Sequence, residues 1–369
     1  MSGSGTTTLQ AVLDDAAVVV CCGSGGVGKT TVAAAIGIEA ARRGRRVVVL
    51  TIDPAKRLAD ALGVDELGAE PQRIDTAGLG ADGGELWAMM LDTASAFTAV
   101  VRRHATDPQQ AERIVANSFF RNMAGSLSGT QEYMAAETLH VLAADERFDL
   151  VVVDTPPTRT ALDFLAAPGV LARFLDHRLF KLLMLPARPG MRMFNVATQP
   201  VLRTIGKVVG SDVLADAIAF FQAFAGMEAG FRQRADDVIA LLRVPTTVFV
   251  LVAAPRREAV GEAAWFAAQL AEQGIDNIAG VANRVHPPFG GGTAAEAEAA
   301  AADAAAEQRP LWNNLAELRR RRESELRTLD EFVVLFAGAP CVEVPQLSSD
   351  VHDADGLGHV GQHLVGAAE

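Results

Sequence analysis

Cysteine is scarce in this sequence, and its scarcity excludes two kinds of site. The 369 residues contain only three cysteines, Cys21, Cys22 and Cys341. Their number is odd and no two have CxxC spacing, so neither a disulfide framework nor a zinc site of that type is available. We expect the three thiols to be buried structural side chains in strands.

Long apolar runs and an excess of positive charge are also missing. No apolar run approaches the ~20 residues that a membrane-spanning helix needs, and the N-terminus lacks the basic and apolar regions of a signal peptide. The formal net charge of -12 argues against nucleic acid as the main partner. We therefore expect a soluble, cytoplasmic protein, and 50% hydrophobic residues allow a substantial core in one large domain or two.

An apolar stretch, a glycine-rich loop and a helix-forming segment follow one another over residues 18–31, VVVCCGSGGVGKTT. Gly23, four further residues, then Gly28, Lys29 and Thr30 have the spacing of a phosphate-binding loop. Glycines let successive backbone N–H groups turn toward phosphate oxygens, and the helix N-terminus adds positive potential. Lys29 would contact the β- and γ-phosphates and Thr30 would bind Mg²⁺. The motif predicts ATP and Mg²⁺ as ligands.

Two acids follow apolar stretches that we predict to be buried strands. Asp53 comes after residues 47–51, and Asp154 ends residues 149–154. Ligands of open α/β sheets bind at the carboxyl ends of such strands. Asp53 is placed to orient or deprotonate a water that attacks the γ-phosphate, or to form an Asx-turn before the next proline, and the two roles are compatible. Asp154 is placed to hold Mg²⁺ directly or through a water.

The alternation of apolar stretches with helical segments predicts an α/β fold, a doubly wound, mostly parallel sheet with an inserted helical subdomain. The predicted strands are residues 17–22, 47–51, 85–92, 149–154, 247–252, 278–281, 332–336 and 341–344. The predicted divisions are a mobile N-terminus (1–15), core segments (16–93, 146–165 and 244–369), helical segments (94–145) and a helical subdomain (166–243).

Two stretches allow more than one interpretation. Residues 290–308 are of low complexity and have little to bury, which favours a helix or a mobile acidic connection, and Arg319–Arg322 are expected on a solvated helix face. Residues 160–242 are rich in Leu, Met and Phe, which suits either a groove for an apolar client or an ordinary helix bundle.

Several segments together resemble the arsenical-pump and guided-entry ATPase family, a P-loop class that includes partition and septum-site ATPases. They are Gly23–Thr31, Thr51–Ala55, Asp154–Thr158, Asn283, and Val344–Leu347 with Asp350 and Val351. The resemblance implies a nucleotide-sandwich dimer that closes on ATP binding and opens on hydrolysis. It also implies a switch I carboxylate at Asp53, a switch II and Walker B acid at Asp154, and adenine contacts from Asn283 and the loop at Pro345.

The predicted site thus has three overlapping sets of residues. The catalytic residues are Asp53 and Lys29; the nucleotide-binding residues are Gly23, Ser24, Gly25, Gly26, Val27, Gly28, Lys29, Thr30, Thr31, Asn283 and Pro345; the metal-binding residues are Thr30, Asp154 and Asp53.

The sequence departs from the family pattern at Ser24, where the family carries a lysine that reaches the partner subunit's phosphates. Serine has a hydroxyl but no charge, so it cannot stabilise a transition state in the opposite site as lysine does. A charge supplied in trans contributes on the order of 10³ or more in rate, judged by arginine fingers. We expect either weak hydrolysis by the chain alone, as a homodimer, or a heterodimer with a paralogue that provides the lysine. Paired bacterial genes of this family favour the heterodimer.

Other departures narrow the role. The three cysteines match none of the family's metalloid ligands, Arg159 and Thr160 replace a Gly-His pair, and the CxxC of tail-anchored targeting dimers is missing. Arsenite efflux and tail-anchored targeting are therefore disfavoured. The leading hypothesis is an ATPase that drives a client or membrane partner bound at the helical subdomain. The alternatives are an ATP-binding regulatory or chaperone-like subunit with little hydrolysis and, less favoured, a small-molecule kinase.

Overall fold

The computed structural model describes residues 8–53, 55–75, 84–121, 130–157, 211–224, 227–336, 338–351 and 353–366. The chain forms two compact units, one of Met1–Met90, Leu142–Leu162 and Arg243–Glu369, the other of Leu91–Val141 and Asp163–Leu242. Thr158 of the predicted switch II segment and residues 160–210 of the predicted client-binding helices lie outside the described residues. In the described part of the chain, no helix is long and apolar enough to cross a membrane.

The first unit is built on an eight-stranded sheet of described strands with the order β3-β4-β2-β5-β1-β6-β7-β8. All neighbouring strands are parallel except β3 and β4. The central strands are continuous Val- and Leu-rich runs because both faces of a parallel sheet are covered. The strands are β1 (Val18–Gly23), β2 (Arg46–Thr51), β3 (Gln72–Arg73), β4 (Glu85–Met90), β5 (Leu150–Asp154), β6 (Thr247–Ala253), β7 (Ile278–Val285) and β8 (Cys341–Pro345). The predicted fold class is confirmed.

The three cysteines lie in strands of this sheet. Cys21 and Cys22 are buried in β1, as predicted, whereas Cys341 of β8 is only partly buried. Burial raises the pKa of the Cys22 thiol to about 12 and that of the Cys341 thiol to about 12. These thiols are therefore protonated at neutral pH, as expected of structural side chains.

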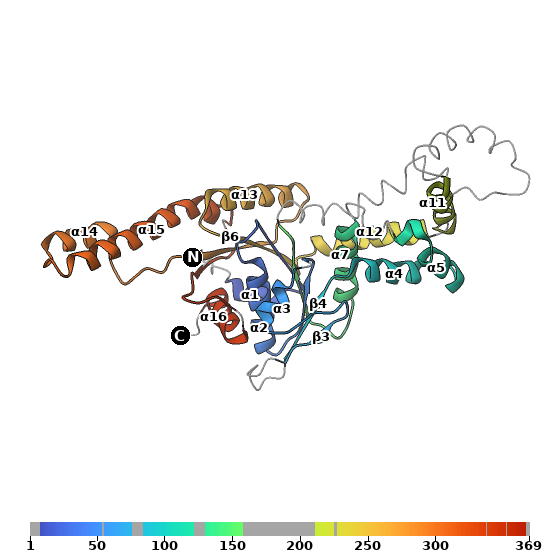
Figure 1. The fold of residues 1–369 in the computed structure, drawn as a ribbon, viewed down its shortest axis with the longest axis horizontal. Helices are drawn as coiled ribbons and strands as arrows, with labels where there is room; N and C mark the ends of the chain where they lie inside the picture. Colours follow the sequence, from blue (N-terminus) through green and yellow to red (C-terminus); the bar gives the residue numbers. More distant parts are fainter. Residues whose placement is uncertain are drawn as a thin grey trace, which may run out of the picture. The chain divides into compact units, whose positions relative to one another are not determined.

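Helices cover both faces of this sheet (Figure 1). On one face, α2 (Lys29–Arg42) packs between the strands and α16 (Ala354–Val365), with α1 (Leu9–Asp15) and α3 (Arg57–Leu62) beside them. On the other face lies α13 (Arg257–Glu272). Gly37 lets α2 approach the sheet closely, because a Cβ there would lie 2.7 Å from a methyl of Val49.

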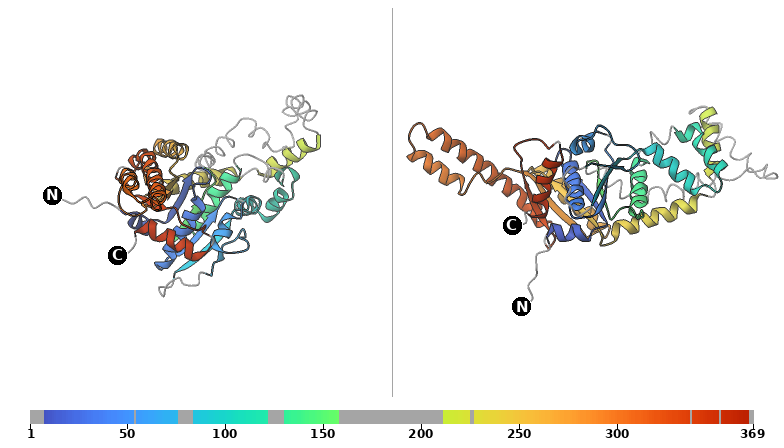
Figure 2. Two further views of the ribbon diagram at one scale, coloured as in Figure 1. Left: turned by 60° about the vertical axis from the view of Figure 1, so that its left-hand side comes forward. Right: turned by 90° about the horizontal axis from the view of Figure 1, so that it is seen from below.

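The α14 (Ala294–Asp303) and α15 (Arg309–Val334) helices run side by side after β7 (Figures 1 and 2). Of the two alternatives for residues 290–308, the helix is confirmed over α14. This helix has a buried face, contrary to expectation, since it packs on α15 and three of its alanines are buried. Thr293 and Glu296 form a capping box that fixes the start of α14.

Two further expectations are wrong. Residues 332–336 are not a strand, because α15 continues to Val334 and its apolar side chains recur at helical spacing, Leu329, Phe332 and Phe336 all being buried. The described part of residues 1–15 is not a mobile tail, because α1 is capped by Thr8 and buries Leu9 and Leu13.

The described helices of the second unit are α4 (Thr93–His104), α5 (Pro108–Val115), α7 (Thr130–Ala143), α11 (Ser211–Phe224) and α12 (Glu228–Arg243). Their phenylalanines pack on one another, and the pair Phe224 and Phe231 has ring centroids 4.9 Å apart. Glu137 is 2% exposed and forms ion pairs with Arg103 at 2.9 Å and Arg234 at 3.3 Å. The buried rings are typical of an ordinary helix bundle, and the rest of the predicted groove region lies outside the described residues.

Candidate functional site

The parallel strands bring the predicted site residues to one edge of the sheet. β1 ends at Gly23, Asp154 is the last residue of β5, and Asp53 lies two residues beyond β2. The sheet register places Asp154 beside Thr51 of β2 on one side and Cys21 of β1 on the other. Distant parts of the sequence therefore meet because each contributes the carboxyl end of a parallel strand.

The loop between β1 and α2 has the glycines that its geometry requires. Gly28 has a φ of +94°, and a Cβ there would lie 2.3 Å from the amide nitrogen of Asn283. Gly23 lies against β6, since a Cβ would come within 2.3 Å of the Val252 carbonyl oxygen. Gly25 and Gly26 are exposed at the tip. The two ends of the loop are thus fixed by contacts with β6 and Asn283, whereas its central glycines are exposed to solvent.

Lys29 begins α2 and extends back across this loop. Its Nζ donates a hydrogen bond of 2.9 Å to the carbonyl oxygen of Ser24, a residue that is itself only 9% exposed. Burial lowers the pKa of Lys29, while the nearby Asp154 carboxylate opposes that shift. The ammonium group therefore lies at the loop, where the sequence predicts phosphate contacts.

Asp154 is fully buried at the end of β5, and one of its oxygens has no hydrogen-bond partner among the described residues. Thr51 donates a hydrogen bond of 3.0 Å to Oδ2, whereas Oδ1 has none. Burial raises the pKa of Asp154 to about 6, and the hydroxyls of Thr30 and Thr51 and the charge of Lys29 act in the opposite direction. A buried carboxylate oxygen without a donor, next to a threonine hydroxyl, fits the hard oxygen ligands that Mg²⁺ prefers.

Asp53 is held from both sides in this structure. Its Oδ1 accepts a hydrogen bond of 3.0 Å from the Ala55 N–H, which is the predicted Asx-turn. Its Oδ2 lies 3.3 Å from Nη1 of Arg57 on α3. Since the side chain remains 21% exposed, it is accessible to a water molecule.

A hollow lies at the carboxyl ends of β7 and β8. The cavity has a volume of about 370 Å³, and its lining comes from the start of α2, the end of β7, the segment after β8 and α16. The predicted adenine-side residues Asn283 and Pro345 both line it, together with Thr31 of α2. The structure therefore brings these residues together, although they are far apart in the sequence.

Asn283 and Arg284 connect β7 to the predicted phosphate-binding loop. The Asn283 amide donates a hydrogen bond of 2.8 Å to the Val27 carbonyl oxygen, and Nη1 of Arg284 donates one of 3.1 Å to the Gly26 carbonyl oxygen. Arg284 adopts a φ of 62°, which is uncommon for a residue other than glycine. The hollow and the loop are thus joined by direct contacts.

The sequence of residues 16–296, more than half of the chain, matches the family model of the anion-transporting ATPases. The chain belongs to the anion-transporting ATPase family. The predicted family is confirmed, and the eight-stranded α/β fold is consistent with it.

Two relatives of this anion-transporting ATPase family member illustrate the extent of the likeness. It is 27% identical over 287 residues to the ATPase GET3 of Malassezia globosa, covering 77% of this chain and 78% of that protein. It is 32% identical over 272 residues to an uncharacterized protein of Streptomyces coelicolor, covering 72% of this chain and 61% of that protein.

Sequence reasoning did not find two arginines at this edge. Arg57 contacts Asp53, and Arg284 contacts the phosphate-binding loop. Arg57 follows Asp53 by four residues, but Asp53 lies before α3, so the i,i+4 rule for helices does not predict the pair. The contact of Arg284 depends on the position of β7 in the sheet, for which the sequence carries no signal.

The hydrogen bonds of two threonines were also not predicted from the sequence. Thr51 donates to Asp154, and the Thr155 hydroxyl donates a hydrogen bond of 2.7 Å to the Cys21 carbonyl oxygen. Both contacts join neighbouring strands, so they follow from sheet register rather than from any local pattern.

Proposed function

We propose that this anion-transporting ATPase family member hydrolyses ATP with Mg²⁺ at the edge formed by β1, β2 and β5. The observation that carries the proposal is the buried Oδ1 of Asp154, which lies beside Thr30 and Lys29 and has no hydrogen-bond partner among the described residues. Thr30 and Asp154 would hold the metal, directly or through water. Mg²⁺ bound there would neutralise charge on the β- and γ-phosphates.

The remaining residues have roles that follow from their positions. Lys29 would bind the phosphates with the backbone N–H groups of the loop. Asp53 would orient the attacking water or accept its proton, because it is partly exposed at the same edge. The cavity that contains Asn283 and Pro345 would take the adenine.

Ser24 supports the further proposal that the active form is a dimer with a lysine-bearing paralogue. Its side chain supplies no charge to an opposite site, so a homodimer would lack that cation in both sites. This dimer would then drive or regulate a client or a membrane partner. An ATP-binding regulatory subunit with little hydrolysis is the second candidate, and the same serine favours it.

Phosphate release by the purified chain, with and without the paralogue, tests these proposals. We expect weak turnover alone, a large increase in the mixture, and loss of both in Asp53→Asn while a fluorescent ATP analogue still binds. No binding of the analogue would refute the ATPase proposal. Mixed-dimer turnover that survives removal of the paralogue's lysine would refute the role of that lysine.

A further inference from the structure

Strand β7 contains a β-bulge where it reaches the carboxyl edge of the sheet. The register with β8 pairs Asn283 with Val344 and Val285 with Pro345, so Arg284 is an extra residue that has no partner in β8. Its φ of 62° is left-handed, a conformation that is uncommon and costly for an arginine. A bulge of this kind changes the direction of a side chain.

The bulge brings two consecutive side chains to the same loop. In a regular strand, neighbours in the sequence point to opposite faces of the sheet. Here the Asn283 amide donates to the Val27 carbonyl oxygen at 2.8 Å, and Nη1 of Arg284 donates to the Gly26 carbonyl oxygen at 3.1 Å. The two hydrogen bonds thus hold adjacent carbonyl groups of the predicted phosphate-binding loop.

The tip of this loop is formed by exposed glycines. A Cβ on Gly25 or Gly26 would meet no atom of the described chain within 4 Å, apart from the neighbouring residues. Glycine has more backbone freedom than any other residue, so it loses the most entropy when it is fixed. Arg284 therefore constrains the part of the loop that would otherwise lose the most entropy when a phosphate binds.

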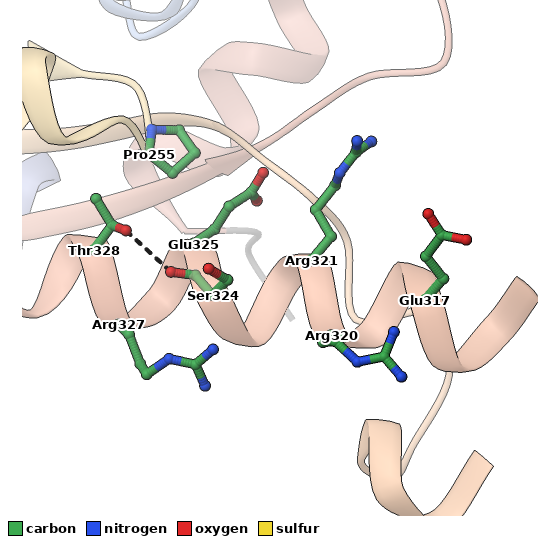
Figure 3. A pocket seen from close by; sticks show the side chains of 8 residues that line it. All are labelled: Pro255, Glu317, Arg320, Arg321, Ser324, Glu325, Arg327 and Thr328. Atoms are coloured by element: carbon green, nitrogen blue, oxygen red, sulfur yellow. Dashed lines mark hydrogen bonds between the residues drawn. The ribbon is translucent and has the colours of Figure 1, made fainter. Parts of the chain in front are cut away.

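Contacts with α15 hold the chain just after the bulge. The backbone N–H of His286 donates to Glu325 at 2.8 Å, and Nδ1 of His286 lies 2.7 Å from the same carboxylate. Glu325 projects from α15 on the side opposite Arg327 (Figure 3). Arg322 donates to the His286 carbonyl oxygen and, at 2.8 Å, to the carboxylate of Glu343 on β8. A costly φ persists only where surrounding contacts fix the backbone, as they do here.

The four consecutive arginines of α15 do not all lie on a solvated face, contrary to expectation. Arg319 donates to the Phe289 carbonyl oxygen at 3.3 Å, and Arg322 makes the contacts just described. Arg320 and Arg321 are exposed, as expected, and no described residue forms an ion pair with Arg321. Two of the arginines therefore fix α15 against the segment that follows β7.

We propose that Arg284 is a positioning residue that orders the tip of the predicted phosphate-binding loop before a nucleotide binds. Its hydrogen bond fixes the Gly26 carbonyl group in the free chain, so less entropy is lost when the loop surrounds a phosphate. The order of the tip does not depend on the proposed function, whereas the gain in nucleotide affinity rests on it.

Backbone dynamics of the nucleotide-free chain test the order of the tip. We expect ¹⁵N order parameters of about 0.85 at Gly25 and Gly26 in the wild type, and below about 0.6 in Arg284→Asn. Asparagine adopts a left-handed φ more readily than arginine, so this variant removes the guanidinium without adding strain, and its melting temperature should not fall. The matched control, Arg321→Asn, removes an exposed arginine of α15 and should leave the order parameters unchanged.

The affinities for a fluorescent ATP analogue and for inorganic pyrophosphate, measured by competition, test the consequence. We expect Arg284→Asn to weaken both by about tenfold, because pyrophosphate contacts the loop but has no base to enter the cavity beside Asn283. The control Arg321→Asn changes the net charge by the same amount and should leave both affinities unchanged.

Several results would overturn the proposal. They are a disordered tip in the wild type, unchanged order parameters in Arg284→Asn, a lower melting temperature of that variant, equal loss of affinity in Arg321→Asn, or a loss for the ATP analogue with none for pyrophosphate. If the wild type bound neither ligand although Arg284 ordered the tip, the proposed function and the gain in affinity would be refuted, while the ordering of the loop would stand.

Discussion

Two buried carboxylates, one in each unit, differ in how their charge is compensated. Each has one oxygen without a hydrogen bond in the described part of the chain. That oxygen of Glu137 lies 3.3 Å from Arg234, and its other oxygen lies 2.9 Å from Arg103. Asp154 accepts a hydrogen bond from Thr51 but forms no ion pair with a described residue. Burial raises the pKa of both groups. The first charge is balanced within the fold and holds helices together; the second is balanced only in part, as expected of a cation ligand.

The largest expected effect is on turnover. Asp154→Asn should reduce Mg²⁺-dependent phosphate release on the order of 10³-fold, since it removes the proposed metal ligand next to the proposed phosphate site. Titration with Mg²⁺ should show the loss. Glu137→Gln is the comparison variant, and an equal loss there would contradict the distinction between the two acids.

The next effect is on stability. Glu137→Ala should lower the free energy of unfolding of the helical unit by about 3–5 kcal/mol, because two arginines lose a buried partner. Hydrogen exchange of the backbone amides of α7 and α12 reports the opening of this unit separately from the sheet. The control Glu112→Ala removes a 65% exposed partner of Arg102 and should cost less than about 1 kcal/mol. Equal losses of stability in the two variants would show that burial of the ion pair does not determine how much it contributes to the free energy of unfolding.

A pH effect of similar or smaller size is expected for Asp154. Its pKa rises from 3.8 to about 6 on folding, so the folded state binds the proton more tightly. Raising the pH from about 4 to about 6 should therefore lower stability by about 2 kcal/mol without metal, a change that Asp154→Asn should remove. Tryptophan fluorescence, from Trp87 among others, can follow unfolding of the sheet unit. If stability depended on pH in the same way in the wild type and in Asp154→Asn, the raised pKa of Asp154 would be contradicted.

The smallest expected effect concerns the charge missing at Ser24. Ser24→Lys should raise turnover of the isolated chain about tenfold when dimers form, because it adds a charge in trans that serine lacks. Ser24→Gln controls for side-chain size. No gain with lysine, in a chain shown to dimerise, would mean that the missing cation does not limit turnover.

Local patterns were sufficient to predict much of the fold. The strands β1, β2, β5 and β6 could be predicted because fully buried parallel strands are continuous apolar runs. The error at residues 332–336 arose because a short apolar run does not distinguish a strand from the end of a helix. The buried face of the alanine-rich α14 was not predicted, because its burial depends on packing against α15, which lies later in the sequence.

The sequence by itself determined the pattern of a phosphate-binding loop and the acids at the ends of two strands, because each is a local pattern with a fixed chemical meaning. The lysine missing at Ser24 is apparent only by comparison with the family that the sequence resembles. The tertiary structure alone decided that Thr51 contacts Asp154 and that Asn283 packs on Gly28. It also decided which arginines of α15 hold the fold and which remain exposed. These contacts join residues far apart in the chain, and only sheet register and helix packing bring them together.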